Sequence, residues 1–273
     1  MEINFNKIIN KINKICHKSP KTFFKRKKLL LSLIRDDKLK KKINNLDSSQ
    51  VKKVIKTTFL PNLDQLYFIY NMITIFKRVT VLEFGVGWST NIISKALLEN
   101  KQKYLDEVRD LRFNNPFHLS TLDNYKKYIV QTKKRMEKQQ QKITSFYFSN
   151  VRTIKFQGRI CTEYEILPNI NPDFIFIDGP SQFNVKGKVS NFNTEHPDLA
   201  PMSSDILKIE PFLKPGTFIL IDGRALNVLF IKNFLYRNWN YHYFHKYDLH
   251  LFFLNGPLLG ELNKRQLKFY KLT

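Results

Sequence analysis

The sequence predicts an α/β protein of three layers, in which helices cover both faces of a mostly parallel sheet. Three observations indicate this fold class. From residue 60 onward, short runs of β-branched and aromatic residues alternate with stretches of helical periodicity, which favours a parallel sheet. Polar turns with glycine or aspartate follow several of these runs directly. The last two β-runs, residues 241–245 and 249–254, are joined by only three residues, so they must pair antiparallel.

The first 57 residues predict a basic helical extension in front of this sheet. They contain 17 Lys or Arg residues and only 4 Asp or Glu residues. Apolar residues recur at helical spacing between Ile3 and Ile15, with lysines mostly on the other face, so a basic amphipathic helix is expected. A second helix is expected over residues 21–35. We therefore expect an N-terminal extension over residues 1–57 and a main domain over residues 58–273.

Two interpretations of this extension stay open. Its helices can lie on an anionic membrane surface, with lysines toward the headgroups. Alternatively, they form a helical cap that is packed on the main domain, with lysines on the solvent side. The N-terminus lacks the apolar core of a secretory signal, and no run approaches the roughly 20 apolar residues of a membrane span. We therefore expect a cytoplasmic protein, with peripheral membrane contact as an option.

The main domain is expected to follow one order of strands and helices. Apolar residues three and four positions apart predict each helix, and β-branched or aromatic runs bounded by turns predict each strand. Helices are expected over residues 60–77, 89–99, 124–141, 205–212 and 225–236. Before the terminal pair, strands are expected over residues 79–84, 118–122, 146–148, 151–156, 174–177 and 217–221. A hairpin around Ser149-Asn150 is expected to join the third and fourth of these strands.

The composition excludes several classes of protein and leaves one question open. Lys and Arg number 46 against 23 Asp and Glu, a formal net charge of +23, and 42% of the residues are hydrophobic. A chain this apolar buries a sizeable core and is not disordered throughout. The charge favours a polyanionic partner, but a composition rich in Lys and Asn is equally typical of an AT-rich genome. Two cysteines, Cys16 and Cys161, provide neither a disulfide framework nor a zinc site.

A turn with two glycines follows the first strand, over residues 83–90. Ligands of open parallel sheets bind at the carboxyl ends of the strands, so this turn is the first place to expect a site. Gly85 and Gly87 permit a tight turn and a close approach of the backbone to a ligand. Ser89 and Thr90 can cap the next helix. The run lacks the third glycine of a dinucleotide fingerprint and the Gly-Lys-Ser/Thr of a phosphate-binding loop, so neither of those sites is favoured.

Asp123 and Asn124 follow the second strand. A carboxylate at this position can accept two hydrogen bonds from the hydroxyls of a ribose. It can also cap the next helix, which is the more ordinary use of such a residue. Because the glycine turn lies beside it, we favour the ribose for Asp123.

Two aspartates end neighbouring buried strands. Asp178 follows residues 174–177, and Asp222 follows residues 217–221. Neighbouring strands are roughly 4.8 Å apart, so the two carboxylates are expected to converge. Such a pair can hold Mg²⁺ or another divalent cation. Arg224 can instead neutralise the pair, and both alternatives stay open.

Taken in this order, the motifs resemble those of class I S-adenosylmethionine-dependent methyltransferases, over about residues 60–254. The run from Glu83 to Ser89 is similar to the family's first motif, Ile177-Asp178-Gly179 to its fourth-strand motif, and residues 212–217 to the turn before its fifth strand. The resemblance implies a Rossmann-like methyltransferase sheet in a catalytic domain. It also implies S-adenosyl-L-methionine as cofactor, bound by Glu83, Gly85, Gly87, Trp88, Ser89, Asp123, Asn124 and Asp178.

The resemblance also concerns catalysis and metal binding. Asp178 and Asp222 are similar to the metal carboxylates of catechol- and macrocin-type O-methyltransferases, in which Asn or Asp usually follows the second aspartate. Here Gly223 follows, so a third ligand is missing. The acceptor hydroxyl must lose its proton to a base or to a metal-bound site, and Asp178 and His196 are the expected catalytic residues. His196 lies in residues 181–202, a loop that is expected to overhang the site.

The implied activity is O-methylation of a small molecule or glycan by in-line methyl transfer. Two alternatives stay open. The charge suits an RNA-modifying methyltransferase, but the sequence has no RNA-recognition motif, so nucleic acid is the less expected partner. The second alternative is a non-catalytic interaction protein on a methyltransferase scaffold. The intact Gly85, Gly87 and Asp123 argue against it.

Overall fold

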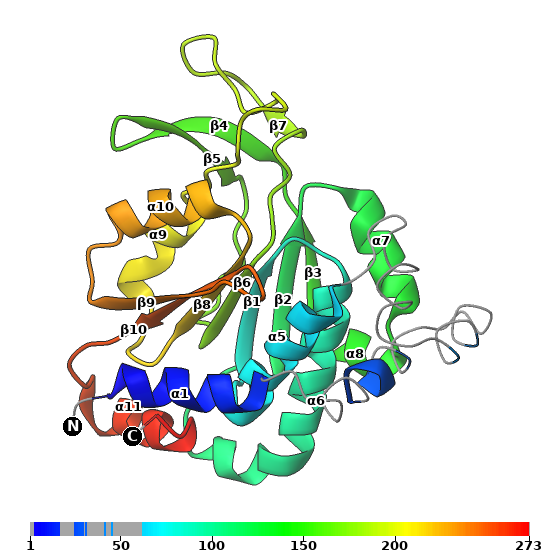
Figure 1. The fold of residues 1–273 in the computed structure, drawn as a ribbon, viewed down its shortest axis with the longest axis vertical. Helices are drawn as coiled ribbons and strands as arrows, with labels where there is room; N and C mark the ends of the chain where they lie inside the picture. The colour runs from blue at the N-terminus through cyan, green and yellow to red at the C-terminus, as the bar shows by residue number, and fades with distance from the viewer. Residues whose placement is uncertain are drawn as a thin grey trace.

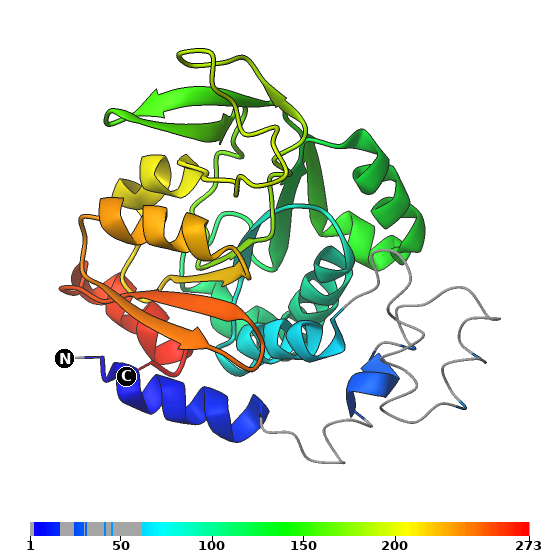
Figure 2. The ribbon, with the colours of Figure 1, turned by 45° about the horizontal axis from the view of Figure 1, so that its top comes forward.

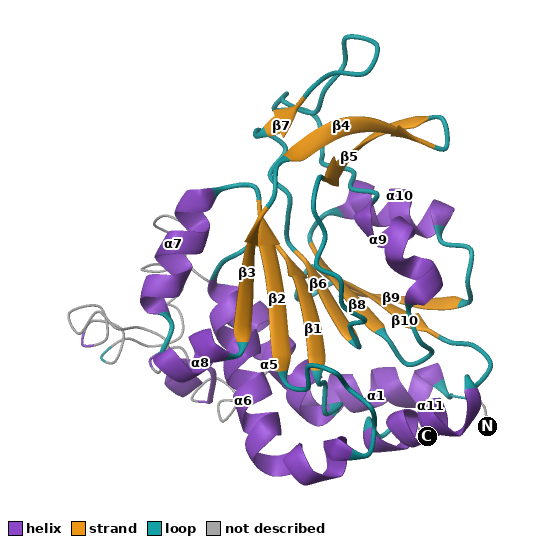
Figure 3. Cartoon of the chain, turned by 180° about the vertical axis from the view of Figure 1, so that it is seen from behind, coloured by secondary structure: helices purple, strands orange, loops and turns teal. Residues whose placement is uncertain are grey.

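A seven-stranded sheet forms the centre of the computed structural model, which describes residues 3–16, 25–29, 31, 41, 45 and 62–272. Its strand order is β3-β2-β1-β6-β8-β10-β9, and helices cover both faces (Figure 1, Figure 3). The strands are β1 (Thr80–Phe84), β2 (His118–Asp123), β3 (Thr144–Phe148), β6 (Phe174–Ile177), β8 (Phe218–Asp222), β9 (Trp239–Phe244) and β10 (Leu249–Leu254). The predicted α/β class is confirmed.

Five neighbouring strands of this sheet run parallel, and the last two do not. β1 pairs in parallel with β2 and β6, β2 pairs with β3, and β6 pairs with β8. β10 pairs antiparallel with both β8 and β9, so Leu249 lies opposite Asp222 on one side and Phe244 on the other. The predicted terminal hairpin is therefore confirmed, since the link between β9 and β10 is too short for a crossover.

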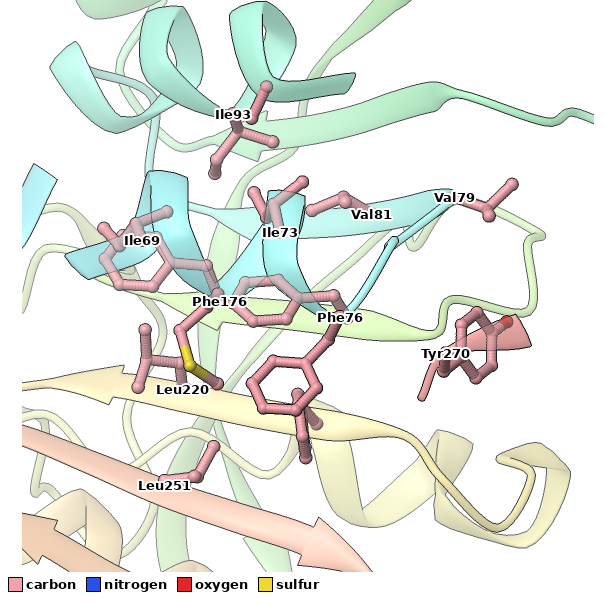
Figure 4. Packing of buried hydrophobic residues seen from close by; sticks show 14 of the residues in the cluster. Ile69, Ile73, Phe76, Val79, Val81, Ile93, Phe176, Leu220, Leu251 and Tyr270 are labelled. Atoms are coloured by element: carbon pink, nitrogen blue, oxygen red, sulfur yellow. The ribbon is translucent and has the colours of Figure 1, made fainter. Parts of the chain in front are cut away.

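One face of the sheet is covered by α5 (Leu63–Ile75) and α6 (Trp88–Arg109), which share a hydrophobic cluster with the strands. Figure 4 shows this cluster around Ile73, Phe76 and Phe176. All three side chains are almost fully buried. These helices place their first turns at the carboxyl edge of the sheet, where the predicted site residues lie.

The opposite face is covered by α9 (Asp205–Ile209) and α10 (Ala225–Phe234), which share a second cluster with the strands. Ile177 and Ile221 of β6 and β8 lie in this cluster, while Phe176 and Leu220 lie in the first. Strands covered on both faces are apolar without alternation, which is why these two appear in the sequence as continuous apolar runs.

A second, three-stranded sheet stands beyond the carboxyl ends of the parallel strands (Figure 1, Figure 2). It has the order β5-β4-β7, from β4 (Val151–Phe156), β5 (Arg159–Tyr164) and β7 (Val185–Lys186). The predicted hairpin around Ser149-Asn150 is wrong, because β3 pairs with β2 in the main sheet while β4 pairs with β5. The hairpin turns at Gln157-Gly158 instead, where both residues have positive φ.

The helix expected over residues 124–141 is two helices, α7 (Lys126–Arg135) and α8 (Lys138–Lys142). Met136 between them has extended backbone, with ψ of 146°, and its side chain is buried. Periodicity alone does not reveal this break, because both helices keep the same polar composition.

The C-terminal helix α11 (Gly260–Phe269) is a further element that the pattern of apolar residues does not predict. It packs on the same face of the sheet as α5 and α6, with Leu267 and Phe269 buried. Asn263 and Gln266 are also buried, and they donate hydrogen bonds to the carbonyl oxygens of Pro215 and Leu111. Half of the buried positions are thus polar, so the helix has no apolar stripe to show in the sequence.

The helix α1 (Phe5–Cys16) packs against the main domain. Its isoleucines at positions 8, 9 and 12, and Ile3 just before it, are buried in the cluster around α5. Phe5 stacks on Phe253 of β10 with 5.9 Å between ring centroids. An apolar face that is already buried cannot also enter a lipid surface, so only the lysines remain for a membrane contact. The second expected helix lies largely outside the described residues, as does the boundary at residue 57, so the division into two parts stays a prediction.

No helix in the described part of the chain combines the length and the apolar character that crossing a bilayer requires.

Truncating Ile12 should destabilise the whole domain, because its side chain is only 2% exposed and lies in the main core. We expect Ile12→Ala to lower the free energy of unfolding by about 2–5 kcal/mol in urea denaturation. Lys14→Ala, which shortens an exposed side chain of the same helix, is the control and should change it little. Equal stability of the two variants would show that α1 does not belong to the folded core.

Candidate active site

The glycine turn meets the end of β6 where two adjacent parallel strands finish. Gly85 has a φ of +96°, and a Cβ there would lie 2.9 Å from the carbonyl carbon of Asp178. A Cβ on Gly179 would lie 2.8 Å from the amide nitrogen of Gly85. Both positions therefore require glycine. The close approach that Gly85 permits is to the neighbouring strand, which holds the turn down on the sheet.

Every backbone N–H of residues 85–87 donates to a protein acceptor. The acceptors are the Leu122 carbonyl for Gly85, Oδ2 of Asp123 for Val86 and Oγ1 of Thr90 for Gly87, at 2.8, 2.8 and 3.0 Å. Gly87 faces open space, since a Cβ there would meet no atom within 4 Å. The turn thus presents a fixed backbone surface to a ligand, with its N–H groups already used.

Glu83 lies beneath this turn with 0% of its surface exposed. Its Oε2 accepts hydrogen bonds from the hydroxyls of Thr90 and Thr121, both at 2.7 Å. Burial raises the pKa of Glu83 to about 7, although hydroxyl donors around it act in the opposite direction. Its Oε1 is buried and has no hydrogen-bond partner among the described residues. Glu83 therefore supports the turn through Oε2, and its expected contact with a cofactor stays a prediction.

Trp88 and Ser89 begin α6 directly after the turn. The guanidinium of Arg135, at the end of α7, lies 4.5 Å from the ring centre of Trp88, a cation–π contact. Ser89 is buried and its hydroxyl contributes to the hydrogen bonds around Glu83. Trp88 flanks the turn and packs, partly buried, against the main hydrophobic cluster, whereas Ser89 belongs to the support beneath the turn.

Asp123 ties the glycine turn to the start of the helix that follows β2. Its Oδ2 accepts from the Val86 N–H and its Oδ1 from the Tyr125 N–H, at 2.8 and 2.7 Å. Burial raises the pKa of Asp123 to about 6, and the charge of Asp178 adds to the rise. Each carboxylate oxygen can accept a second hydrogen bond, so the side chain retains capacity for a ligand hydroxyl.

Asn124 holds the loop formed by residues 181–202 over this edge. Its Nδ2 donates to the carbonyl oxygen of Asn184 at 2.8 Å, and Nδ2 of Asn184 donates back to the carbonyl of Asn124. Oδ1 of Asn124 is buried and has no hydrogen-bond partner among the described residues. The expectation that the loop overhangs the strand ends is confirmed by these contacts.

Asp178 and Asp222 converge at the ends of β6 and β8, where a hydrogen bond joins their carboxyl groups. Desolvation by the surrounding protein raises the pKa of both, and for Asp222 the charge of Asp178 adds to the rise. Asp178 is itself exposed and Asp222 is half-buried. Two carboxyl groups this close do not both ionise readily, which favours one proton shared by the pair. Arg224 donates to the carbonyl oxygens of Asp178 and Pro180 at 2.6 and 3.0 Å. Gln65 donates through Nε2 to Oδ1 of Asp222 at 2.5 Å.

The donor set around this pair does not fit the divalent cation that the sequence suggests. Within the described ranges, no third Asp, Glu, His or Cys joins Asp178 and Asp222. The Gln65 amide and the Arg224 guanidinium place N–H donors beside the pair, where a hard cation needs further oxygen ligands. A metal at this position stays a prediction, and no step below depends on it.

His196 is an exposed residue of the overhanging loop. Its Nδ1 accepts a hydrogen bond from the Asp198 N–H at 3.2 Å, and its carbonyl oxygen accepts one from Gln182. These bonds lie within its own loop and do not link it to the strand ends. Its expected role as a base therefore stays a prediction.

Two residues at this edge escape prediction from the sequence. Gln65 in the first turn of α5 reaches Asp222 and also donates to the Tyr247 carbonyl at 2.9 Å. The N-cap signal of Asn62 marks where α5 begins, but nothing local shows that it faces a residue 157 positions later. Tyr164 ends β5, and its hydroxyl lies 2.9 Å from where a Cβ of Gly179 would be. The sequence does not predict strand β5, so it gives no indication that Tyr164 reaches this edge.

The strand ends bring the motifs to one edge of the sheet in a fixed order. The glycine turn follows β1, Asp123 ends β2, Asp178 follows β6 and Asp222 ends β8, beside an antiparallel terminal pair. This strand order, with its antiparallel terminal pair, is that of the class I methyltransferase fold.

No known family profile matches the chain, and no curated protein matches it in sequence. Among solved structures, it is similar to the O-methyltransferase TomG of Streptomyces achromogenes, involved in tomaymycin synthesis, in complex with S-adenosylmethionine. That match has 11% identity and a TM-score of 0.41, and covers 75% of this chain and 86% of that one. At this distance the likeness carries no argument about function.

Two further similar structures were solved with S-adenosylhomocysteine. The methyltransferase PaMTH1 of Podospora anserina is 12% identical, with coverage of 92% of this chain and 95% of that chain. An O-methyltransferase from Bacillus cereus is 14% identical, with coverage of 82% and 99%. Both have a TM-score of 0.41, so neither similarity indicates the activity of this chain.

Replacing Glu83 with Gln should remove a pH-dependent penalty on folding. The folded-state pKa of about 7 lies above the ordinary value of 4.5, so the parent loses stability as the pH rises through this range. Gln keeps an acceptor for the hydroxyls of Thr90 and Thr121 and carries no charge. The unfolding free energy of Glu83→Gln should therefore rise relative to that of the parent between pH 4.5 and pH 7, measured by urea denaturation. A difference that stays constant with pH would show that Glu83 does not titrate as described.

Proposed function

We propose that the protein is an S-adenosylmethionine-dependent methyltransferase that O-methylates a small molecule or glycan. The observation that carries the proposal is the single edge at which the glycine turn, Asp123 and the Asp178–Asp222 pair meet. Asp123 contacts the turn through Val86, and Asp178 contacts it through Gly85. A ligand on this edge would touch all three at once, as a cofactor with an amino-acid part and a ribose requires.

The chemistry of the residues fits such a cofactor. Asp123 retains lone pairs that can accept from two ribose hydroxyls. Buried polar atoms normally have partners, but Oδ1 of Asn124 and the hydroxyl of Tyr164 have none among the described residues. Gly87 leaves space above the turn. Asn124 and Asn184 hold the loop over residues 181–202 above this edge.

Bound S-adenosylmethionine supplies an electrophilic methyl group on a sulfonium, which reacts with a nucleophile in line with the breaking bond. The protein's part is to orient the acceptor, exclude water and take the proton of the acceptor hydroxyl. The ionised member of the Asp178–Asp222 pair is the base that we propose, because it lies at the edge where the turn ends. Arg224 fixes the backbone of Asp178, and Gln65 fixes the carboxyl of Asp222. His196 is the alternative base.

Binding of S-adenosylhomocysteine to the purified protein, measured by calorimetry, tests the proposal. We expect the parent to bind in the micromolar range and Asp123→Ala to bind at least about tenfold more weakly. Two lost hydrogen bonds to a charged group exceed the 1.4 kcal/mol that a tenfold change requires.

Asp106→Ala is the matched control, because it removes an acid of α6 whose side chain is 85% exposed. This variant should bind like the parent. Absence of heat and of thermal stabilisation in the parent, with S-adenosylmethionine or with S-adenosylhomocysteine, would contradict the proposed function.

A further inference from the structure

Tyr164 reaches from the second sheet into the edge where β1 and β6 finish. Its ring packs against Phe84 with 5.8 Å between centroids, and the residue is 3% exposed. Its backbone N–H donates to Oδ1 of Asp205 at 3.0 Å, which fixes it at the end of its strand. Its hydroxyl lies 2.9 Å from the position of a Cβ on Gly179. The phenol therefore points at the junction between the glycine turn and the end of β6.

This hydroxyl is buried and has no hydrogen-bond partner among the described residues. A buried polar group without a partner costs free energy of folding, so its retention needs a reason. Burial first, and then the charges of Asp123 and Asp205, raise the pKa of Tyr164 well above its ordinary value. The phenol therefore stays protonated and remains a hydrogen-bond donor.

The neighbouring donors of the turn are not available to a ligand. The N–H groups of Gly85, Val86 and Gly87 are all used inside the protein. The carboxylate of Asp123 is an acceptor, which suits ribose hydroxyls but repels an anionic group. An anion bound beside Gly85 and Asp178 needs a donor, and the Tyr164 hydroxyl is an unused one at that place.

We propose that the Tyr164 hydroxyl donates a hydrogen bond to the carboxylate of the amino-acid part of bound S-adenosylmethionine. The inference rests on the proposed function and deepens it, because it gives the second sheet a role in selecting the cofactor. Asp123 would hold the ribose, and Tyr164 would distinguish a nucleoside that carries an amino-acid tail from one that does not.

The experiment compares Tyr164→Phe with the parent, using two ligands and the thermal midpoint of the ligand-free protein. S-adenosylhomocysteine carries the carboxylate, and 5′-methylthioadenosine has the same nucleoside without it. We expect Tyr164→Phe to weaken binding of S-adenosylhomocysteine roughly ten- to a hundredfold, as for a hydrogen bond to a charged group, and to leave binding of 5′-methylthioadenosine unchanged. The midpoint without ligand should stay the same or rise, because an unpartnered buried hydroxyl is removed.

Tyr70→Phe is the matched control. The Tyr70 hydroxyl donates to Oε2 of Glu99 at 2.5 Å, so this change should lower the thermal midpoint and leave both ligand affinities unchanged. A Tyr164→Phe variant that behaves like Tyr70→Phe would overturn the inference, as would equal weakening for both ligands.

A second variant, Tyr164→Ala, tests whether the ring acts only by occupying space. If Tyr164→Ala bound S-adenosylhomocysteine more tightly than the parent, the ring would occupy the place of the cofactor and the inference would fail. If the parent bound S-adenosylhomocysteine but Tyr164→Phe bound it equally well, the inference would fail while the proposed function stood. If the parent bound neither ligand, both would fail.

Discussion

The contact between Gly85 and Gly179 constrains the rest of the site, because neither residue has room for a Cβ at the ends of two adjacent strands. The turn is therefore pressed onto the end of β6. In that position its Val86 N–H reaches Asp123 on one side, while Gly179 lies under the Tyr164 hydroxyl on the other. This steric requirement thus places the turn close to both Asp123 at the end of β2 and Tyr164 at the end of β5.

Several carboxyl groups at this edge have raised pKa values, and the charge of Arg224 offsets the rise only in part for Asp178 and Asp222. Burial is the main reason that the pKa values of Glu83, Asp123 and Asp222 are raised, and each such group lowers the stability of the folded protein at neutral pH. At the opposite edge, burial raises the pKa of Asp173 to about 6 as well, although the charge of the buried Arg78 acts in the opposite direction. Arg78 also donates to the carbonyl oxygens of Asp173 and Gly216. The carboxyl edge differs in that three acids with raised pKa values, Asp123, Asp178 and Asp222, gather there, which is typical of a functional site.

Much of this arrangement could be predicted from the sequence, because parallel strands end at a common edge. That rule was enough to bring together the glycine turn, Asp123, Asp178 and Asp222. The rule does not predict that Glu83 lies beneath the turn. A carboxylate that supports a turn and one that faces a ligand can stand at the same position in the sequence.

Contacts between segments that are distant in the chain could also not be predicted from the sequence. Gln65 and Tyr164 reach the site from elements whose placement depends on tertiary packing, and no local pattern records that placement. The amphipathic pattern of α1 likewise fits a membrane surface and a protein core equally well, and burial of Ile12 is what distinguishes them.

Amide hydrogen exchange of the parent with and without S-adenosylhomocysteine tests most directly whether the strand ends form one cofactor site. We expect slower exchange with ligand at residues 85–90, 122–125 and 162–165 together, and no change in α11. Unchanged exchange at the turn, or protection confined to another face of the protein, would contradict it.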